Sequence, residues 1–592
     1  MKNLLKRKIT NFKFEYFTLI FFSLLIIITS GRGADFGEYS KWAEYFTEFD
    51  LSLWDEYSKS INGKPLVQWQ YGVGLIGAII NKLFGIEIFI EKFFEPFHHN
   101  SIRASALSSI LSLINFSLLI FILKKNLKDN KFFLLIFFSF FLFTPAGYYF
   151  NKFSTESLSI LLILISLTIS EINHEKFKNS HYVAPVMIGI INYFLILVKA
   201  TNIFTCLCLV VIFLSSIPKK KMIFSANYKY ILKILFILAI IPFIAVAMMS
   251  VYHLIINGNI LLSPYNITDH PFSSLDFKNL KTFEILFSPL HGMIFYHPVL
   301  LFSFFYLCKK ILFNKKFFNT KNLICVSVIF AFLGQLLMQS AFFIWWEGTG
   351  TFGSRTFSGI SVLIFYSLLK LKKEIKSISL SNSFIFVIIL VMIYQSYILG
   401  LGETSFKNLN SFLSNKQDLF DRNSFQKDNI ILFFSIFFII LLSLYLKISL
   451  KINKLFFLIC VLVLTTIIAY LALLLFQYNN RPYLLPLIFL ISFTFTKYHK
   501  NIFSITTYYL KRLPNFMSLY LLLLVFVISI FFQLIFFSQL KSVPLNDNIK
   551  GKNFSCVDWA ASYNEYLQIP GYNYEKFVLL NFLEKNKCEP VK

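Results

Sequence analysis

The sequence contains few charged residues, and acidic residues are the scarcer kind. Only 15% of its 592 residues are charged, with 30 Asp and Glu against 56 Lys and Arg. Soluble domains usually have about 25% charged residues. By contrast, 56% of the chain is hydrophobic and 19% is aromatic. This composition excludes an ordinary soluble globular protein and predicts a chain that folds in lipid.

The chain also lacks a metal-ligating thiol cluster, a phosphate-binding glycine loop and internal repeats. Five of its seven cysteines lie within apolar runs or at the end of one, where thiols usually only pack: Cys206, Cys208, Cys308, Cys325 and Cys460. Cys556 and Cys588 differ, because both belong to the C-terminal tail. They can form a disulfide in an oxidising compartment, and the sequence leaves this pairing open.

Long hydrophobic runs dominate what is present. A helix rises 1.5 Å per residue, so runs of about 15–24 residues with their flanks cross a hydrocarbon core of about 30 Å. We expect an all-α polytopic membrane protein with about thirteen to fifteen crossings. They fall near 14–30, 101–123, 132–149, 155–171, 182–198, 200–217, 229–252, 291–308, 322–344, 356–370, 383–401, 429–447, 455–476, 482–496 and 517–538.

The net charge of +26 reflects membrane orientation rather than nucleic-acid binding. Lysines and arginines form short clusters between the apolar runs, and such clusters favour the cytoplasmic side. Lys2, Lys6, Arg7 and Lys8 therefore place the N-terminus inside, and the first run is interpreted as a retained helix. One topology puts the other clusters, which include Lys125, Lys309 and Lys370, on the same side and the tail outside. It predicts no nucleic-acid partner.

The first outer loop, residues 31–100, is acidic and aromatic. Its aromatic residues Tyr39, Trp42, Phe46 and Phe49 recur every three to four positions, which predicts an amphipathic helix at the membrane interface. The apolar stretch 70–84 is short and rich in glycine, so we expect an interfacial or re-entrant segment there.

Two acids follow directly after the first crossing. Asp35 and Glu38 lie in the stretch 33–43. A partly desolvated carboxylate gains basicity, as a general base requires. A solvated loop acid is the alternative interpretation for both residues.

Three cations are predicted on the outer side, where they can bind a phosphate or only reach toward lipid headgroups. Arg355 ends the stretch 345–355, which begins with Trp345 and Trp346 and contains glycines that let the backbone approach a ligand. The other two cations are Lys199 and Arg481.

Further polar residues occur where helices are expected to enter from the outer side. His291 and His297 lie in the proline-containing stretch 288–298, and Glu156 begins the run 155–171. Each can contact a substrate or serve only the local helix structure. Glu91, Glu95 and His98 share a helical face with the spacing of metal ligands, but a solvated face is the favoured interpretation.

Taken in order, these segments resemble the GT-C superfamily of polytopic glycosyltransferases, which includes protein O-mannosyltransferases and aminoarabinose transferases. Three stretches of the first outer loop are similar to it: Gly-Ala-Asp-x-x-Glu-Tyr at 33–39, Asp-Leu-Ser-Leu-Trp-Asp-Glu-Tyr at 50–57 and Tyr-Gly-Val-Gly-Leu at 71–75. Two later stretches are also similar: Ser-Pro-x-x-Gly-x-x-Phe-Tyr-x-Pro at 288–298 and Trp-Trp-x-Gly-x-x-x-Phe-Gly-x-Arg at 345–355. The resemblance covers about residues 14–370. It implies a membrane catalytic module at 1–370, further transmembrane helices at 371–538 and an outer tail at 539–592.

The resemblance implies an inverting transferase that moves a sugar from a polyprenyl-phosphate donor to a lipid, glycan or protein acceptor on the outer face of a bacterial plasma membrane. Asp35 matches the catalytic base, with Glu38 as its substitute. Arg355, Lys199, Arg481 and His291 are expected to bind the donor phosphate. Trp345, Trp346, Glu156 and His297 are expected to line the substrate. The resemblance requires no nucleotide site, and a divalent metal cofactor stays open.

Two other classes remain as alternatives. An O-antigen polymerase or ligase also joins lipid-linked glycans with many helices, but its basic residues gather in a large late loop, whereas the loop at 402–428 is modest. A transporter or flippase would show inverted repeats and charges in the middle of helices. The sequence shows neither feature.

Overall fold

The structure is a computed structural model of the whole chain, which divides into two compact units. Every described residue belongs to the unit formed by Gly31–Ser379, Glu403–Asp421 and Ser518–Lys592. The described residues are 31–32, 36–49, 71–84, 102–127, 144–150, 152–176, 182–217, 228–257, 277–278, 280–287, 292–312, 320–342, 354–371 and 523–535.

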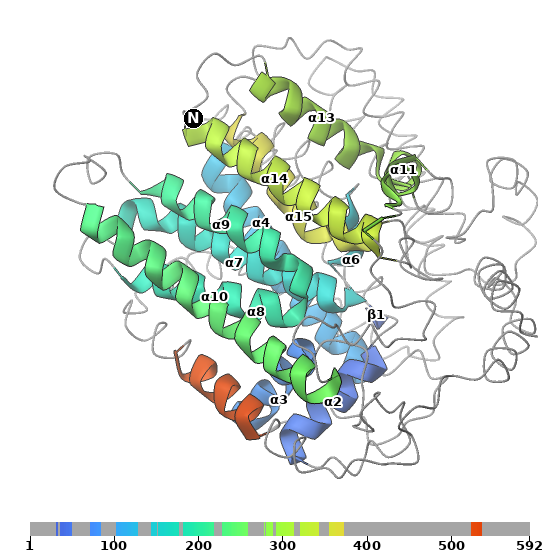
Figure 1. Cartoon of the computed structure of the whole chain (residues 1–592), viewed down its shortest axis with the longest axis vertical. Coiled ribbons are helices and arrows are strands. Elements are labelled where there is room, and N and C mark those ends of the chain that lie inside the picture. The colour runs from blue at the N-terminus through green and yellow to red at the C-terminus, as the bar shows by residue number, and fades with distance from the viewer. Residues whose placement is uncertain are drawn as a thin grey trace, which may run out of the picture. The chain divides into compact units, whose positions relative to one another are not determined.

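The described part is helical, apart from one short strand pair (Figure 1). Its longer helices are α2 (Phe36–Glu48), α3 (Gly72–Phe84), α4 (Ile102–Leu127), α7 (Thr155–Lys176), α8 (Val183–Val198), α9 (Ile203–Ser216), α10 (Tyr228–Asn257), α13 (Pro298–Leu312), α14 (Thr320–Ala341), α15 (Ser358–Lys370) and the helix Leu523–Ile535. The shorter ones are α6 (Pro145–Tyr149), η2 (Ala200–Asn202), α11 (Thr282–Phe287), α12 (Met293–Tyr296) and η5 (Arg355–Phe357).

Four of these helices are long and apolar enough to cross a membrane. Their apolar segments are Ile110–Leu127, Thr155–Ile172, Ile231–Ile255 and Lys321–Ala341, with mean hydropathy of 1.7, 1.7, 2.8 and 2.0. The predicted helical character is therefore confirmed for this part apart from the strand pair, and the four apolar segments are consistent with the predicted membrane protein. The predicted crossings at 14–30, 383–401, 429–447, 455–476 and 482–496 lie outside the described residues.

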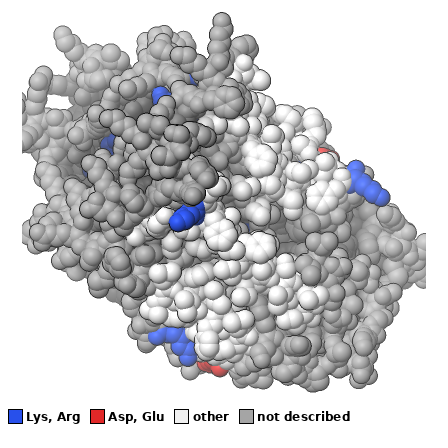
Figure 2. All heavy atoms as spheres, turned by 60° about the vertical axis from the view of Figure 1, so that its left-hand side comes forward, with Lys and Arg blue, Asp and Glu red and all other residues white. Residues whose placement is uncertain are grey.

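The exterior of α10 explains why such a helix needs lipid. Only 22% of its apolar segment is buried within the protein. Leu232, Phe236 and Phe243 are 57%, 67% and 63% exposed. On the face shown in Figure 2, the described surface is almost entirely uncharged, with only a few Lys, Arg and acidic residues. Contiguous apolar surface of this kind is unfavourable in water and fits membrane association.

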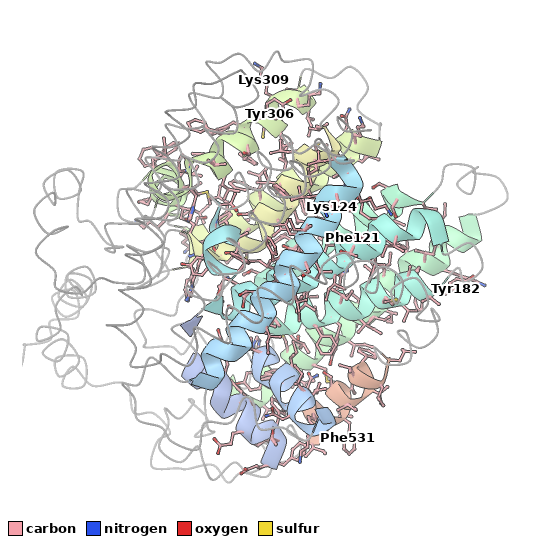
Figure 3. The ribbon with its side chains drawn as sticks, turned by 180° about the vertical axis from the view of Figure 1, so that it is seen from behind. Phe121, Lys124, Tyr182, Tyr306, Lys309 and Phe531 are labelled. Carbon is pink, nitrogen blue, oxygen red and sulfur yellow. The ribbon has the colours of Figure 1, made fainter. Side chains whose placement is uncertain are left out.

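Helix α7 lies in the interior of the bundle. It contacts α4 and α6 as well as α8, α9 and α15, while α10 packs on α8 and α14 on α9. Basic residues mark the C-terminal ends of two further helices, Lys124 on α4 and Lys309 on α13, both labelled in Figure 3. The arrangement leaves α7 and α8 rich in buried residues.

The helix predicted in the first outer loop is present as α2, and its aromatic face is covered by protein. Tyr39, Trp42 and Phe46 are buried. The Trp42 ring stacks on Phe46 at 5.7 Å and meets the ring of Tyr252 of α10 at 6.1 Å. The sequence pattern identified the apolar face correctly, but protein rather than lipid covers it, because α3 packs along α2.

The glycines of α3 have a packing role. A Cβ atom at Gly74 would lie 2.2 Å from Trp42 Cβ, and one at Gly72 would lie 2.2 Å from the backbone carbonyl carbon of Leu197. Only glycine allows these approaches. The segment expected to be interfacial or re-entrant is therefore a 13-residue helix fitted tightly against α2 and α8.

The helix Leu523–Ile535 attaches to this bundle through buried polar side chains. Tyr71 Oη donates to Gln533 Oε1 at 2.9 Å, and the hydroxyls of Tyr193 and Ser529 lie 2.9 Å apart. Phe49 meets Phe532 edge-on at 5.1 Å. Phe531, labelled in Figure 3, is 59% exposed. Side chains more than 300 positions apart in the sequence are thus hydrogen-bonded to one another.

Candidate functional site

The site begins with the turn that starts α7. Ser157 Oγ accepts from the Ser154 backbone N–H at 3.0 Å, and Ser154 Oγ accepts from the Ser157 N–H at 3.4 Å. This reciprocal capping satisfies two backbone donors at the start of the helix. It fixes Glu156 in the first turn, where its side chain is only 4% exposed. The sequence Ser154-Thr-Glu-Ser157 therefore sets the position of a buried carboxylate.

Lys199 reaches this carboxylate from the end of α8. Its backbone is extended, and the chain turns there into η2, with the Asn202 N–H donating to the Lys199 carbonyl at 2.9 Å. Asn202 Nδ2 donates to Ser159 Oγ of α7 at 2.9 Å, which ties the turn to the same helix as Glu156. Lys199 Nζ lies 3.3 Å from Glu156 Oε1.

Arg355 approaches from a third segment, at the start of η5. Its Nε lies 4.0 Å from Glu156 Oε1. Ser358 Oγ donates to the Arg355 carbonyl at 2.6 Å and holds the turn that leads into α15. A close approach of α15 to the bundle supports this position, because a Cβ at Gly359 would lie 2.9 Å from Ile163 Cδ1 of α7.

The three side chains differ in their access to solvent. Glu156 is buried, whereas Lys199 and Arg355 are 18% and 25% exposed. Both cations are directed at the same carboxylate oxygen, while Thr155 Oγ1 donates to Glu156 Oε2 at 3.0 Å. Partly buried charge pairs of this kind are held in fixed geometry. The arrangement presents two partly exposed cations that are suited to contact an anionic ligand.

A second ion-pair cluster lies at the other end of α7. Tyr366 Oη and Asn126 Nδ2 donate to Glu171 Oε1 at 2.8 and 3.0 Å, and Lys370 Nζ forms a hydrogen-bonded ion pair with the same oxygen. Sequence reasoning did not single out this cluster. The sequence does contain a matching spacing. Glu156 and Glu171 are separated by the same number of positions as Arg355 and Lys370, so two neighbouring helices can place an acid beside a cation at both levels.

The structure thus brings together three predicted site residues, Glu156, Lys199 and Arg355. His297, another predicted residue, is fully buried between α12 and α13. Glu38 lies in α2, and its side chain is not described. The other predicted residues lie outside the described part: Asp35, Arg481, His291, Trp345, Trp346 and the trio Glu91, Glu95 and His98, as well as the pair Cys556 and Cys588.

Short segments on either side of Asp35, residues 31–32 and 36–49, are nevertheless described. Gly31–Arg32 forms β1, which pairs in parallel with β2 (Lys152–Phe153), so that Arg32 lies opposite Phe153. This two-stranded contact was not predicted and is the exception to the all-helical expectation. Helix α2 begins at Phe36. The pairing joins the segment before Asp35 to the segment that leads directly into Glu156.

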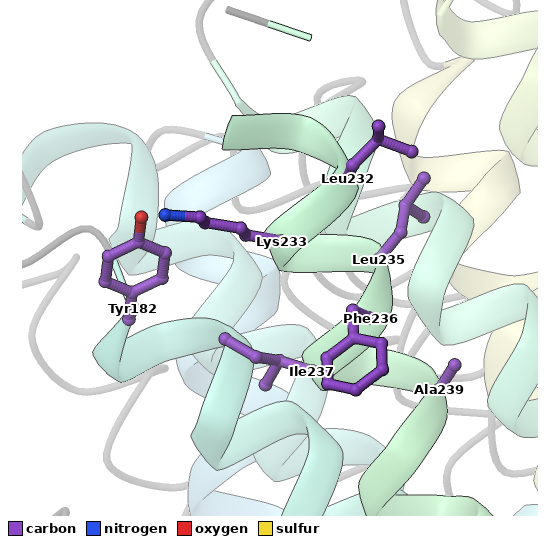
Figure 4. A pocket seen from close by; sticks show the side chains of 7 residues that line it. All are labelled: Tyr182, Leu232, Lys233, Leu235, Phe236, Ile237 and Ala239. Atoms are coloured by element: carbon purple, nitrogen blue, oxygen red, sulfur yellow. The ribbon is translucent and has the colours of Figure 1, made fainter. Parts of the chain in front are cut away.

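A shallow apolar groove lies elsewhere, on the N-terminal part of α10. Figure 4 shows Lys233 and Tyr182 directed toward each other at one side, with Phe236 and Ile237 along the helix. Leu232, Leu235 and Ala239 complete the lining. Among the described residues, no group of three or more His, Cys, Asp or Glu side chains could hold a metal ion.

No family model, curated protein or solved structure matches the chain.

Proposed function

We propose that the protein is an inverting membrane glycosyltransferase that takes a sugar from a polyprenyl-phosphate donor and passes it to a lipid, glycan or protein acceptor on the outer face. The observation that supports this is the convergence of Lys199 and Arg355 on buried Glu156. Two partly exposed cations held in one place can bind the donor phosphate and stabilise it as the sugar leaves.

The proposed reaction needs one base and one anion site. The acceptor oxygen forms a bond to the anomeric carbon while the bond from that carbon to the phosphate oxygen breaks, and the bonding pair stays on the phosphate. Asp35, or Glu38 in its place, takes the proton from the acceptor. The pairing of Arg32 with Phe153 supports a base near the cations, because Phe153 precedes Glu156 by three residues. Arg481 and His291 are further proposed phosphate contacts.

The proposed topology has about thirteen to fifteen crossings, with a cytoplasmic N-terminus and the tail outside. Two clusters support its sidedness. Glu156, Lys199 and Arg355 were all predicted at outer ends of helices, and they lie together. Lys125 and Lys370 were predicted inside, and both hydrogen-bond to Glu171. If the predicted sides were wrong, residues predicted outside and residues predicted inside would be expected to contact one another in the same cluster.

The test is transfer of radiolabelled sugar from a panel of polyprenyl-phosphate sugars in membranes that contain the wild type, Asp35→Asn, Arg355→Ala or Lys233→Ala. We expect both site variants to lose at least about a hundredfold of the transfer rate. Lys233→Ala is the matched control, because it removes an exposed cation at the groove on α10.

Each other outcome has a definite meaning. Wild-type membranes that transfer no sugar from any donor contradict the proposal and favour the polymerase or transporter alternatives. Full activity in Asp35→Asn moves the base to Glu38. Full activity in Arg355→Ala, at equal expression, removes the observation on which the proposal rests.

A further inference from the structure

A buried carboxylate beside two phosphate-binding cations requires an explanation, because it weakens their attraction for any anion. Glu156 neutralises half of the charge that Lys199 and Arg355 supply. A site selected only for tight phosphate binding would not contain it. Glu156 is an integral part of the site, because it is buried, forms ion pairs with both cations and accepts a hydrogen bond from Thr155.

We propose that Glu156 sets the charge preference of this site, so that it accepts a phosphodiester monoanion and releases a phosphate monoester dianion. The inference rests on the proposed function. It makes Glu156 a determinant of product release rather than a base or a metal ligand.

The reaction itself changes the charge at the phosphate. The donor is a phosphodiester with one negative charge. When the bond between the sugar and the phosphate oxygen breaks, the electron pair remains on that oxygen and the acceptor proton goes to the base. The leaving lipid phosphate then has close to two negative charges at neutral pH, because its second pKa is about 6. Substrate and product therefore differ by about one charge where they contact the cations.

The position of Glu156 makes the site sensitive to the charge of its ligand. Its carboxylate lies against both Lys199 and Arg355, so a phosphate bound to these cations also lies close to the negative charge of Glu156. Repulsion from the carboxylate acts twice as strongly on a dianion as on a monoanion. This repulsion favours departure of the spent carrier relative to binding of the donor.

The chain provides a matched control at the opposite end of the same helix. Glu171 is also a partly buried glutamate of α7 paired with a lysine. It lies 15 residues from Glu156 in the sequence, which is about 22 Å along a helix. Removal of its charge should affect the stability of the bundle in a comparable way, but that charge is too distant to discriminate between ligands at the first site.

The experiment measures the affinity of two probes for the purified full-length protein in nanodiscs at pH 8 by titration calorimetry. The probes are geranyl phosphate, a dianion, and its methyl ester, a monoanion. In Glu156→Gln the affinity for the dianion should rise at least about tenfold more than the affinity for the monoanion. Glu171→Gln and the charge-conserving Glu156→Asp should keep the wild-type ratio of the two affinities.

A ratio unchanged in Glu156→Gln overturns the inference, and so does an equal shift in Glu171→Gln. If Glu156→Gln fails to fold, as judged by its elution and thermal unfolding, Glu156→Asn removes the same charge and serves in its place. Failure of the proposed function looks different, because neither probe would then bind to the wild type. In the transfer assay, Glu156→Gln should be inhibited by geranyl phosphate at lower concentrations than the wild type.

Discussion

The positions of individual charges carry most of the functional argument. Lys199 and Arg355 are separated by more than 150 residues, yet both meet one oxygen of Glu156. Lys199 and Arg355 are only 18% and 25% exposed, so both cations are partly desolvated. A charge that loses its partner here is destabilising, because the remaining charge is already desolvated.

At this scale we predict that Lys199→Met lowers the free energy of unfolding by about 1–3 kcal/mol, since Glu156 loses its nearest cation. Denaturant unfolding in detergent, followed by tryptophan fluorescence, measures the change. The double variant with Glu156→Gln should recover part of the loss. A double variant in which the two losses simply add would show that the pair does not interact.

The sequence identified these three residues but not their relationship. Lys199 and Arg355 were predicted to be phosphate ligands because they are cations at expected helix ends. Glu156 was interpreted as either a capping acid or a residue lining the substrate, since local sequence shows only its place in the first turn of a helix. The pairing itself depends on contacts between distant segments, which periodicity does not encode.

At the scale of helices and strands, hydrophobic periodicity predicted the helices well and their neighbours poorly. The run 155–171 became α7, and the break at Lys199 divides α8 from α9 as expected. The sequence predicted the aromatic face of α2 correctly, but it did not predict that α3 and Tyr252 pack against that face. The parallel pairing of β1 with β2 involves only two residues from each segment, too few for a sequence signal.

The packing of α3 gives a prediction for one glycine. Gly74→Ala should lower the free energy of unfolding by about 1–3 kcal/mol, because the new methyl group meets Trp42 Cβ and the backbone of α2. Thermal unfolding of the purified variant measures the loss. Gly189→Ala is the control and should cost less, since its Cβ meets the flexible end of Ile241 at 2.9 Å. Equal losses would contradict the packing role of Gly74.

At the scale of the whole molecule, two lysines predicted on opposite sides of the membrane, Lys281 and Lys309, give the proposed topology its test. We predict that, in a background without native cysteines, Lys281→Cys reacts with a membrane-impermeant maleimide added to intact cells, whereas Lys309→Cys reacts only after permeabilisation. Lys281 is 47% exposed, and its N–H bonds to the Ser340 carbonyl near the end of α14. Lys309 is exposed near the end of α13. The reverse labelling would invert the proposed orientation.

The length of α7 between its two clusters also bears on the depth of the site in the membrane. About 22 Å separates the levels of Glu156 and Glu171 along the helix, whereas a typical hydrocarbon core is about 30 Å thick. Because α7 lies inside the bundle, other helices rather than lipid surround it. With α7 centred in the bilayer, both clusters would lie below the level of the lipid headgroups. The headgroup of the proposed lipid-linked donor would then have to descend to meet Lys199 and Arg355.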